Sequence, residues 1–178
     1  MELYQLNGTI KKEADLPVNY LNSDTDGVVW GEGSAFFVLS NQQNENAYAE
    51  LADVTFINKL ETSEIQEFTE SFLEKNGLKN SEIDVILLGF SGDAASDQYY
   101  KKLLPSFADS CQVYFKHLSG EFNTASGFAF FIANQILKTQ EIPELLKING
   151  VLKEDIKNVL IYNHLNGEDH SLTLLKKI

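Results

Sequence analysis

Apolar blocks of strand length recur along the second half of the chain. Residues 83–89 are almost continuously apolar, which predicts a strand that is covered on both faces of its sheet. Shorter apolar runs at 112–115, 159–162 and 171–175 predict three more strands. The pair Asn166-Gly167 between the last two runs is a strong hairpin signal, so we expect these strands to be antiparallel.

Three other segments have the apolar spacing of helices. The first begins near Thr62 and should end before Gly77, with its apolar positions on one face: Ile65, Phe68, Phe72 and Leu73. Residues 95–107 predict a second helix, and residues 116–123 predict a polar loop. Residues 125–139 predict a third helix that is apolar almost all round, so we expect it to be deeply buried.

The N-terminal part has a weaker pattern. Residues 1–20 are polar and are interpreted as an irregular lead-in. Residues 28–40 predict a strand in which Gly31 and Gly33 indicate a bulge or a close approach to another backbone segment. After the polar turn NQQNEN, residues 47–58 predict a second strand, and we expect the two strands to form an antiparallel hairpin.

This order of elements predicts one α/β domain over residues 1–178, with a mixed sheet that carries helices on its faces. The length is enough for a single compact domain. Hydrophobic residues make up 43% of the chain and charged residues 22%, which is typical of a globular protein.

The charge of the chain limits its partners. It has 26 acidic residues against 14 basic ones, a formal net charge of −12, and such a surface repels the phosphates of nucleic acids. No apolar run approaches the roughly 20 residues of a membrane span, and no apolar signal core follows the N-terminus. We therefore expect neither a nucleic-acid nor a membrane partner, and a cytoplasmic location.

Few residues suggest chemistry on their own. Cys111 is the single cysteine and lies in an apolar run, so it is interpreted as a packed thiol rather than a nucleophile. The three histidines lack metal-ligand spacing and are interpreted as exposed or turn residues: His117, His164 and His170. Asp93 and Asp97 stand at the start of a predicted helix, where the helix dipole accounts for them. We expect no metal and no other cofactor.

The segment 24–39 reads DTDGVVWGEGSAFFVL. Its Asp26-Gly27 pair and its Gly31-Glu32-Gly33 element, followed by an apolar strand, are similar in spacing to the RDGFVxGEGAGxxVLE stretch of β-ketoacyl synthases. A phosphate-binding loop would need a different spacing and a following helix, so the glycines here are interpreted as structural.

Two further segments resemble the same family in the same order. Residues 83–97 are similar to IDYINAHGTSTPLGD, with Asp97 at the final aspartate, but Gly89 stands where that family has its first catalytic histidine. Residues 116–127 resemble KSxTGHxxGAAG, with matches that include Lys116, Gly120, Ala125 and Gly127. Glu121 occupies the position of the second histidine.

The resemblance covers about residues 20–178 and implies the C-terminal half of a β-ketoacyl synthase. It implies a thiolase-like half-domain with a mixed five-stranded sheet. That family consists of acyltransferases, the 3-oxoacyl-[acyl-carrier-protein] synthases, whose preceding half supplies the nucleophilic cysteine. Because that half and both histidines are lacking here, no catalytic set is intact, and only Lys116 remains. Whether the protein is an enzyme stays open, and an ion pair with Glu121 is the favoured interpretation of Lys116.

The resemblance also implies a biological setting. We expect a non-catalytic, chain-length-factor-like protein of fatty-acid, polyketide or polyene biosynthesis. Its partners would be an acyl carrier protein and either a ketosynthase subunit or the absent N-terminal half, in a homo- or heterodimer. Helix 125–139 should then present an apolar patch to that partner.

Two alternatives stay open. The chain could belong to an active synthase in which Lys116, together with Glu121 or His117, replaces the usual pair. It could also be a non-enzymatic interaction module on a thiolase-like fold. The interpretation as a whole requires Gly89 and Glu121 to lie close together in the folded chain.

Overall fold

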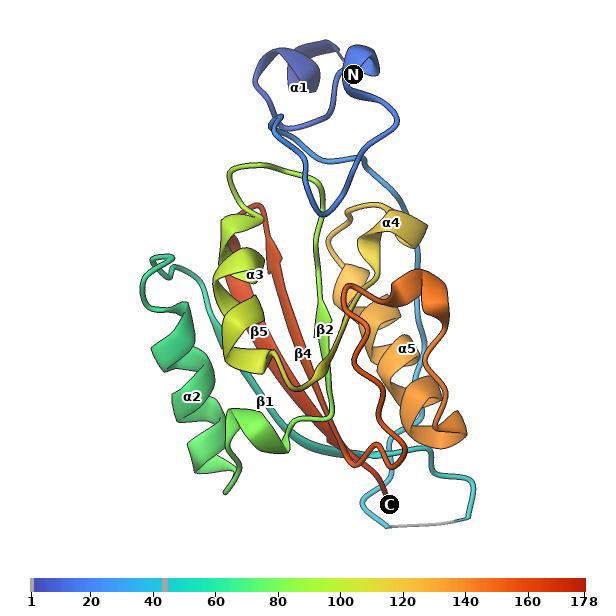
Figure 1. Cartoon of the computed structure of the whole chain (residues 1–178). Helices are drawn as coiled ribbons and strands as arrows, with labels where there is room; N and C mark the ends of the chain where they lie inside the picture. Colours follow the sequence, from blue (N-terminus) through green and yellow to red (C-terminus); the bar gives the residue numbers. More distant parts are fainter. Residues whose placement is uncertain (1, 43–44) are drawn as a thin grey trace.

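A five-stranded mixed sheet forms the centre of the computed structural model, which describes residues 2–42 and 45–178 (Figure 1). In the order of the sheet, the strands are β1 (Glu50–Ile57), β5 (Glu168–Lys176), β4 (Asn158–Leu165), β2 (Val85–Leu88) and β3 (Cys111–Tyr114). Strand β2 is parallel to β3 and to β4, whereas β5 is antiparallel to β4 and to β1. The predicted mixed five-stranded sheet is thus confirmed.

The hairpin between β4 and β5 forms as its turn residues indicate. Asn166 and Gly167 have φ angles of 50° and 78°. Both values lie in the left-handed region that a two-residue hairpin turn requires, and glycine and asparagine enter this region most readily.

Helices cover the two faces of the sheet (Figure 1). On one face, α2 (Ile65–Lys75) and α3 (Gln98–Leu103) pack against alternate residues of β2, Ile86 and Leu88. On the other face, α5 (Ala125–Thr139) packs against Val85 and Leu87. Because both side-chain sets of β2 are buried, its sequence is continuously apolar, as predicted.

Several helices depart from expectation. The predicted helix at 95–107 is divided into the short α3 and a 3-10 helix, η3 (Leu104–Phe107), because Pro105 has no N–H to donate to a continuing α-helix. The loop predicted at 116–123 contains a short helix, α4 (Lys116–Ser119). Helix α5 has the predicted bounds but is buried on one side only, since Phe131 is half exposed. The remaining short helices are α1 (Glu2–Leu6), η1 (Glu13–Asp15), η2 (Asn80–Glu82) and η4 (Glu144–Leu146).

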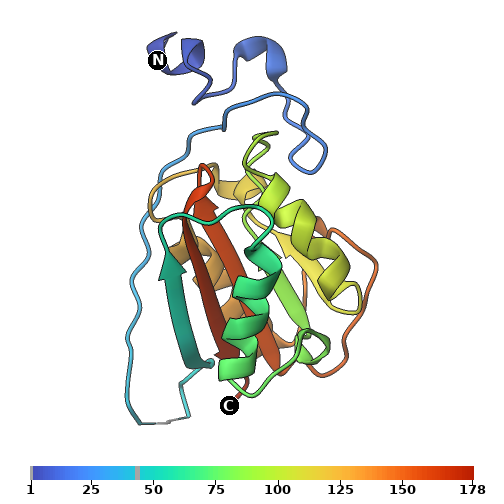
Figure 2. The same ribbon diagram turned by 90° about the vertical axis from the view of Figure 1, so that its left-hand side faces the viewer.

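The predicted N-terminal hairpin is wrong. Strand β1 pairs with β5, and residues 28–40 form no strand (Figure 2). Its strand-type pairing in the described chain is limited to two isolated bridges, from Val28 to Ile10 and from Trp30 to Glu121. The physical reason lies in Gly31, whose close approach to the backbone after α4 directs the chain along α5 and away from β1. Residues 43–44 of the predicted turn lie outside the described part of the chain.

Residues 8–28 form a cap beyond one end of the sheet (Figure 1). The Gly27 N–H donates to the Asp93 carboxylate at 2.8 Å, and the Ala94 N–H donates to the Thr25 carbonyl at 3.0 Å. The buried Lys11 ammonium donates within the cap, to the hydroxyls of Ser23 and Thr25. Among the described residues, no helix has the length and apolar character to cross a membrane.

Gly31 should tolerate no side chain. A Cβ at this position would overlap the Ser119 carbonyl oxygen, which belongs to a constrained backbone turn. Gly31→Ala should therefore lower the free energy of unfolding by about 2–3 kcal/mol or more, measured by urea denaturation. Gly150→Ala is the matched control, because a Cβ at Gly150 meets no atom within 4 Å. Equal stabilities of the two variants would contradict the close approach.

Candidate functional site

The three parallel strands end at one edge of the sheet, where the candidate site lies. Gly89 follows β2 directly, and it lies level with Asn163 because Leu88 pairs with Tyr162 of β4. Lys116 begins helix α4, just after β3. The carboxyl ends of parallel strands are the usual position of ligand sites in α/β folds.

A buried ion pair forms the centre of this site. The Lys116 Nζ atom lies 2.6 Å from the Glu121 Oε2 atom, and their side chains are 0% and 2% exposed. The Lys116 ammonium also donates to the His164 carbonyl at 3.1 Å. Burial lowers the pKa of Lys116 and raises the pKa of Glu121, and in both cases the attraction of the partner opposes the shift. The predicted ion pair is therefore present.

Gly89 lies directly beside this pair. A Cβ at Gly89 would lie 3.1 Å from the Lys116 Cε atom and 2.7 Å from the Tyr100 hydroxyl, and it would overlap the Asn163 Oδ1 atom. Gly89 and Glu121 therefore both adjoin Lys116, as the resemblance requires. The space for a side chain at Gly89 is filled by Tyr100 and Asn163, so no imidazole fits there without rearrangement.

Two buried aspartates stabilise the turn after β2. Asp97 accepts hydrogen bonds from the backbone N–H groups of Ser91 and Gly92, at 3.0 and 2.8 Å, and from the Ser91 hydroxyl. Burial raises the pKa of Asp97 to about 6, although these hydrogen bonds oppose the shift. Asp93 accepts from Gly27 and Ser96.

The sequence suggested that the two aspartates interact with the dipole of the following helix, whereas their hydrogen bonds show a different role. Asp97 occupies the N-cap position of α3, but its side chain makes no capping hydrogen bond to that helix. Its carboxylate is turned back to the preceding loop instead. Among the described residues, no group of three histidine, cysteine or acidic side chains could hold a metal ion.

His164 and His170, interpreted as exposed or turn residues, lie on either side of the turn between β4 and β5, but both are buried, so the expectation of exposure is wrong. The His170 Nε2–H donates to the Gly167 carbonyl at 3.0 Å, so its Nδ1 atom accepts from the Tyr162 hydroxyl at 2.9 Å. The His164 ring stacks on Tyr100 with centroids 4.4 Å apart. Burial lowers the pKa of both histidines. The sequence indicated only the turn beside these histidines. Their burial could not be predicted, because the aromatic residues that cover them come from α3 and β4.

The other candidate residues stay apart from the ion pair. The His117 ring stacks on Tyr114 with centroids 3.9 Å apart and touches Tyr20 edge-on. Cys111 is a buried free thiol in β3, and burial raises its pKa, which agrees with its interpretation as a packed residue.

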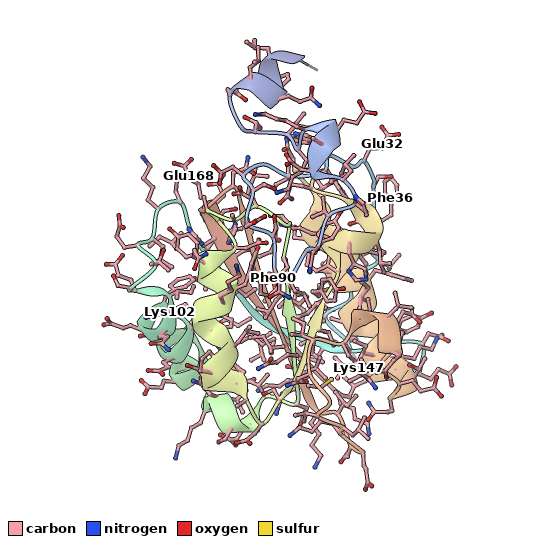
Figure 3. The ribbon with its side chains drawn as sticks, turned by 45° about the horizontal axis from the view of Figure 1, so that its top comes forward. Glu32, Phe36, Phe90, Lys102, Lys147 and Glu168 are labelled. Atoms are coloured by element: carbon pink, nitrogen blue, oxygen red, sulfur yellow. The ribbon has the colours of Figure 1, made fainter. Side chains whose placement is uncertain are left out.

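The glycines of the motif stabilise the site through the backbone. Gly120 has a φ of 72°, and a Cβ there would lie 2.7 Å from the Gly31 nitrogen. A Cβ at Gly127 would lie 3.3 Å from Ala35. Gly27 has a φ of 86° in the cap. The motif's acidic residues Asp26 and Glu32 are exposed, and Glu32 lies on the outside of the molecule (Figure 3).

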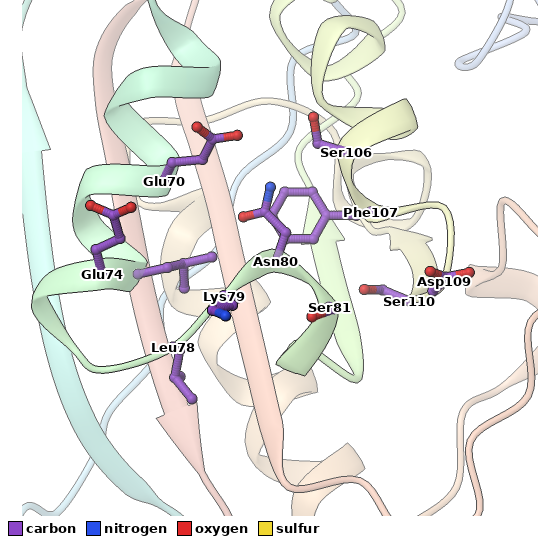
Figure 4. A pocket seen from close by; sticks show the side chains of 11 residues that line it. Glu70, Glu74, Leu78, Lys79, Asn80, Ser81, Ser106, Phe107, Asp109 and Ser110 are labelled. Atoms are coloured by element: carbon purple, nitrogen blue, oxygen red, sulfur yellow. The ribbon is translucent and has the colours of Figure 1, made fainter.

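A cavity of about 430 Å³ lies elsewhere, between α2, η2 and η3 (Figure 4). Leu73 and Phe107 are among its apolar lining residues, and Glu70, Glu74 and Asp109 are its acidic ones. Because η2 precedes β2, this cavity adjoins the amino end of that strand. No candidate site residue from the sequence lines it.

Comparison with solved structures identifies the fold. The ishigamide ketosynthase/chain length factor superposes with a TM-score of 0.72 and 15% identity, over 99% of this chain and 50% of that one. A β-ketoacyl synthase from Burkholderia phymatum STM815 superposes with a TM-score of 0.68 and 14% identity, over 99% of this chain and 51% of that one. A third structure is AntDE:AntF, a type II PKS acyl-carrier protein in complex with its ketosynthase bound to the hexaketide. It superposes with a TM-score of 0.61 and 15% identity, over 74% of this chain and 39% of that one.

These matches show the thiolase-like fold of ketosynthases. The chain spans about half the length of the first of these structures. No protein-family model matches the sequence, and no curated protein matches it significantly. The likeness is therefore one of fold.

Removing one member of the buried pair should destabilise the protein strongly. Lys116→Met leaves Glu121 buried without its cation, so the free energy of unfolding should fall by about 3–5 kcal/mol. The double variant Lys116→Met with Glu121→Leu should recover most of this loss, because neither charge is then buried. Urea denaturation measures both values. Equal losses in the single and double variants would contradict the cost assigned here to an unpaired, buried Glu121 carboxylate.

The dependence of stability on pH should reveal the raised pKa of Asp97. Its pKa is raised from 3.8 to about 6, so the fold binds this proton more tightly than the unfolded chain does. The ionised carboxylate therefore destabilises the fold above pH 6, and this cost disappears as the pH falls to 4. The stability of the wild type relative to Asp97→Asn should rise by roughly 2–3 kcal/mol over that interval. A flat difference, or one that rises with pH, would contradict the shift. Because both proteins keep the buried histidines, their opposing titration cancels.

Proposed function

We propose that this chain is a non-catalytic, ketosynthase-like protein of the chain-length-factor kind. It corresponds to the C-terminal half of a β-ketoacyl synthase and works in fatty-acid, polyketide or polyene assembly. Its role is to complete the protein wall around a growing acyl chain, while an active ketosynthase performs the condensation. The single buried cysteine fits the reducing cytoplasm in which we propose that it works.

The buried ion pair is the observation that carries this proposal. Condensation requires neutral donors that stabilise a thioester enolate, a task for which imidazoles are suited. Here the Glu121 carboxylate lies beside Lys116, where its negative charge would repel a developing enolate. The position of the other imidazole is closed by Tyr100 and Asn163.

The proposed partners are an acyl carrier protein and a ketosynthase polypeptide. The fold is shared with a ketosynthase/chain length factor protein, and another structure of this fold binds an acyl-carrier protein. The partner ketosynthase would supply the cysteine nucleophile, either as a separate subunit or as an adjoining half. We propose a dimeric assembly with that partner.

The alternative of an active synthase has less support. It would require Lys116 to act together with Glu121 or His117. The ammonium of Lys116 is bound to Glu121 and to a carbonyl, and it has no exposed surface. The His117 ring packs between Tyr20 and Tyr114 rather than on the pair. No observation favours a plain interaction module over a chain-length-factor role.

An assay with malonyl and acyl thioesters of an acyl carrier protein tests the proposal. The purified chain should release no carbon dioxide from the malonyl thioester and should form no acyl adduct by mass spectrometry. Glu121→His should not restore decarboxylation, because the Gly89 position still has no space for a second imidazole. Addition of a ketosynthase from the same gene neighbourhood should give a stable complex and condensed product.

The controls separate the alternatives. Decarboxylation or acylation by the chain alone would favour the active-synthase alternative and refute ours. If the ketosynthase gave product of the same chain length with and without this protein, the interaction-module alternative would be favoured. The ketosynthase assayed without the chain gives the reference product.

A further inference from the structure

The cavity between α2, η2 and η3 has no role in the proposed function (Figure 4). It adjoins the amino ends of two strands, because Ser81 lies shortly before β2 and Ser110 lies directly before β3. The buried ion pair lies at the carboxyl ends of the same strands, and the two sites share no residue. A volume of about 430 Å³ is that of a typical site for a small organic molecule.

The cavity is acidic at two separate places. Glu70 and Glu74 lie one helical turn apart on the same face of α2, and Asp109 comes from the segment after η3. Figure 4 shows the two glutamates on one side of the cavity and Asp109 on the other. None of these carboxylates takes part in an ion pair within residues 2–42 and 45–178. Lys79 is the single basic residue of the lining, so the cavity attracts cations and repels anions.

The separation of these carboxylates indicates the shape of the cation. Among the residues that the structure describes, no three acidic, histidine or cysteine side chains converge closely enough to hold a metal ion. A cation with a single charge would leave one side of the cavity without its partner. A ligand that carries a positive charge at each end is complementary to both sides.

The lining between the two acidic sides is apolar. Leu73 of α2 and Phe107 of η3 belong to it, and Figure 4 shows the Phe107 ring between the glutamates and Asp109. Both side chains are almost completely buried, so they are fixed by the core beneath the cavity. Methylene groups that cover this lining would be removed from water, which favours binding.

Asn80 adds an unpaired acceptor to this lining. Its Oδ1 atom is buried and accepts no hydrogen bond in the described part of the chain. A buried acceptor without a donor lowers the stability of the fold. Figure 4 shows the Asn80 amide between Glu70 and Phe107, and the terminal amide of asparagine turns readily about its last bond. An N–H group in the middle of a ligand would therefore find an acceptor here.

We infer that this cavity binds a linear aliphatic polyamine. Its terminal ammonium groups pair with Glu70 and Glu74 at one end and with Asp109 at the other, and its methylene groups cover Leu73 and Phe107. An inner N–H group donates to Asn80. Ammonium–carboxylate hydrogen bonds are among the strong ones, and they fix both ends of the ligand. The inference goes beyond the proposed function and does not rest on it.

Isothermal titration calorimetry with spermidine tests this inference. At an ionic strength of about 0.15 M, where general attraction to an acidic protein is largely screened, the chain should bind one spermidine saturably. n-Butylamine should bind by roughly tenfold or more weakly, because it has one ammonium group and reaches one acidic side only. In nitrogen-15 NMR spectra, the side-chain amide resonances of Asn80 should shift on addition of spermidine.

Variants on the two acidic sides provide the matched comparison. Glu70→Gln and Asp109→Asn each remove one carboxylate from the lining, so each should weaken spermidine binding by about fivefold or more. Glu67→Gln is the control, since Glu67 is an exposed residue of the same helix that does not line the cavity. It should bind spermidine within about twofold of the wild type. Urea denaturation checks that all three variants are folded.

The contact with Asn80 has its own comparison. 1,8-Diaminooctane has the same chain length as spermidine, with a methylene group in place of the inner nitrogen. Asn80→Ala should weaken spermidine binding by about threefold or more, because the inner N–H group then loses its acceptor. Binding of 1,8-diaminooctane by Asn80→Ala should stay within about twofold of its binding by the wild type.

Several results would overturn this inference. They are the absence of saturable spermidine binding, equal affinity for n-butylamine, or equal losses in Glu67→Gln and Glu70→Gln, which would indicate attraction to the acidic surface as a whole. Equal effects of Asn80→Ala on spermidine and on 1,8-diaminooctane would overturn the contact with Asn80. The proposed function is tested separately, because decarboxylation and acylation assays contain no polyamine and none of these variants lies at the ion pair.

Discussion

Burial of the Lys116 ammonium is the constraint on which the rest of this site depends. A charged group without exposed surface requires a compensating charge and hydrogen bonds, or the fold loses several kcal/mol. Glu121 and the His164 carbonyl meet that requirement from two different elements, the loop before α5 and strand β4. The ion pair thus stabilises the edge of the sheet at which the parallel strands end.

The same residues connect the cap and the N-terminal segment to this edge. The Glu121 N–H donates to the Val29 carbonyl, and its own carbonyl accepts from the Gly31 N–H. The two glycines, Gly31 and Gly120, allow these backbones to approach closely. Glu121 therefore has a structural role both through its carboxylate and through its backbone. Its carboxylate binds the Lys116 ammonium, which is the group that a catalytic site would need.

Much of the fold could be predicted from the sequence because its pattern is local. Helices α2 and α5 and strands β2 and β3 were identified within a few residues, since each has a strong apolar period or a continuous apolar run. The N-terminal hairpin was not, although residues 28–40 have a strand-like pattern. Their path depends on a contact between Gly31 and residues 119–120, which no local pattern reveals.

The sequence by itself determined which side chains stand at the catalytic positions of the similar family, namely Gly89, Lys116 and Glu121, and hence that no imidazole is among them. Only the tertiary structure decided what surrounds them: that Tyr100 and Asn163 fill the space at Gly89, that His164 and His170 are buried, and that residues 34–39 make no backbone hydrogen bond within the described part of the chain. The physical reason is that residue identity is a property of the chain, whereas burial and unpaired hydrogen-bonding groups are properties of contacts between distant segments.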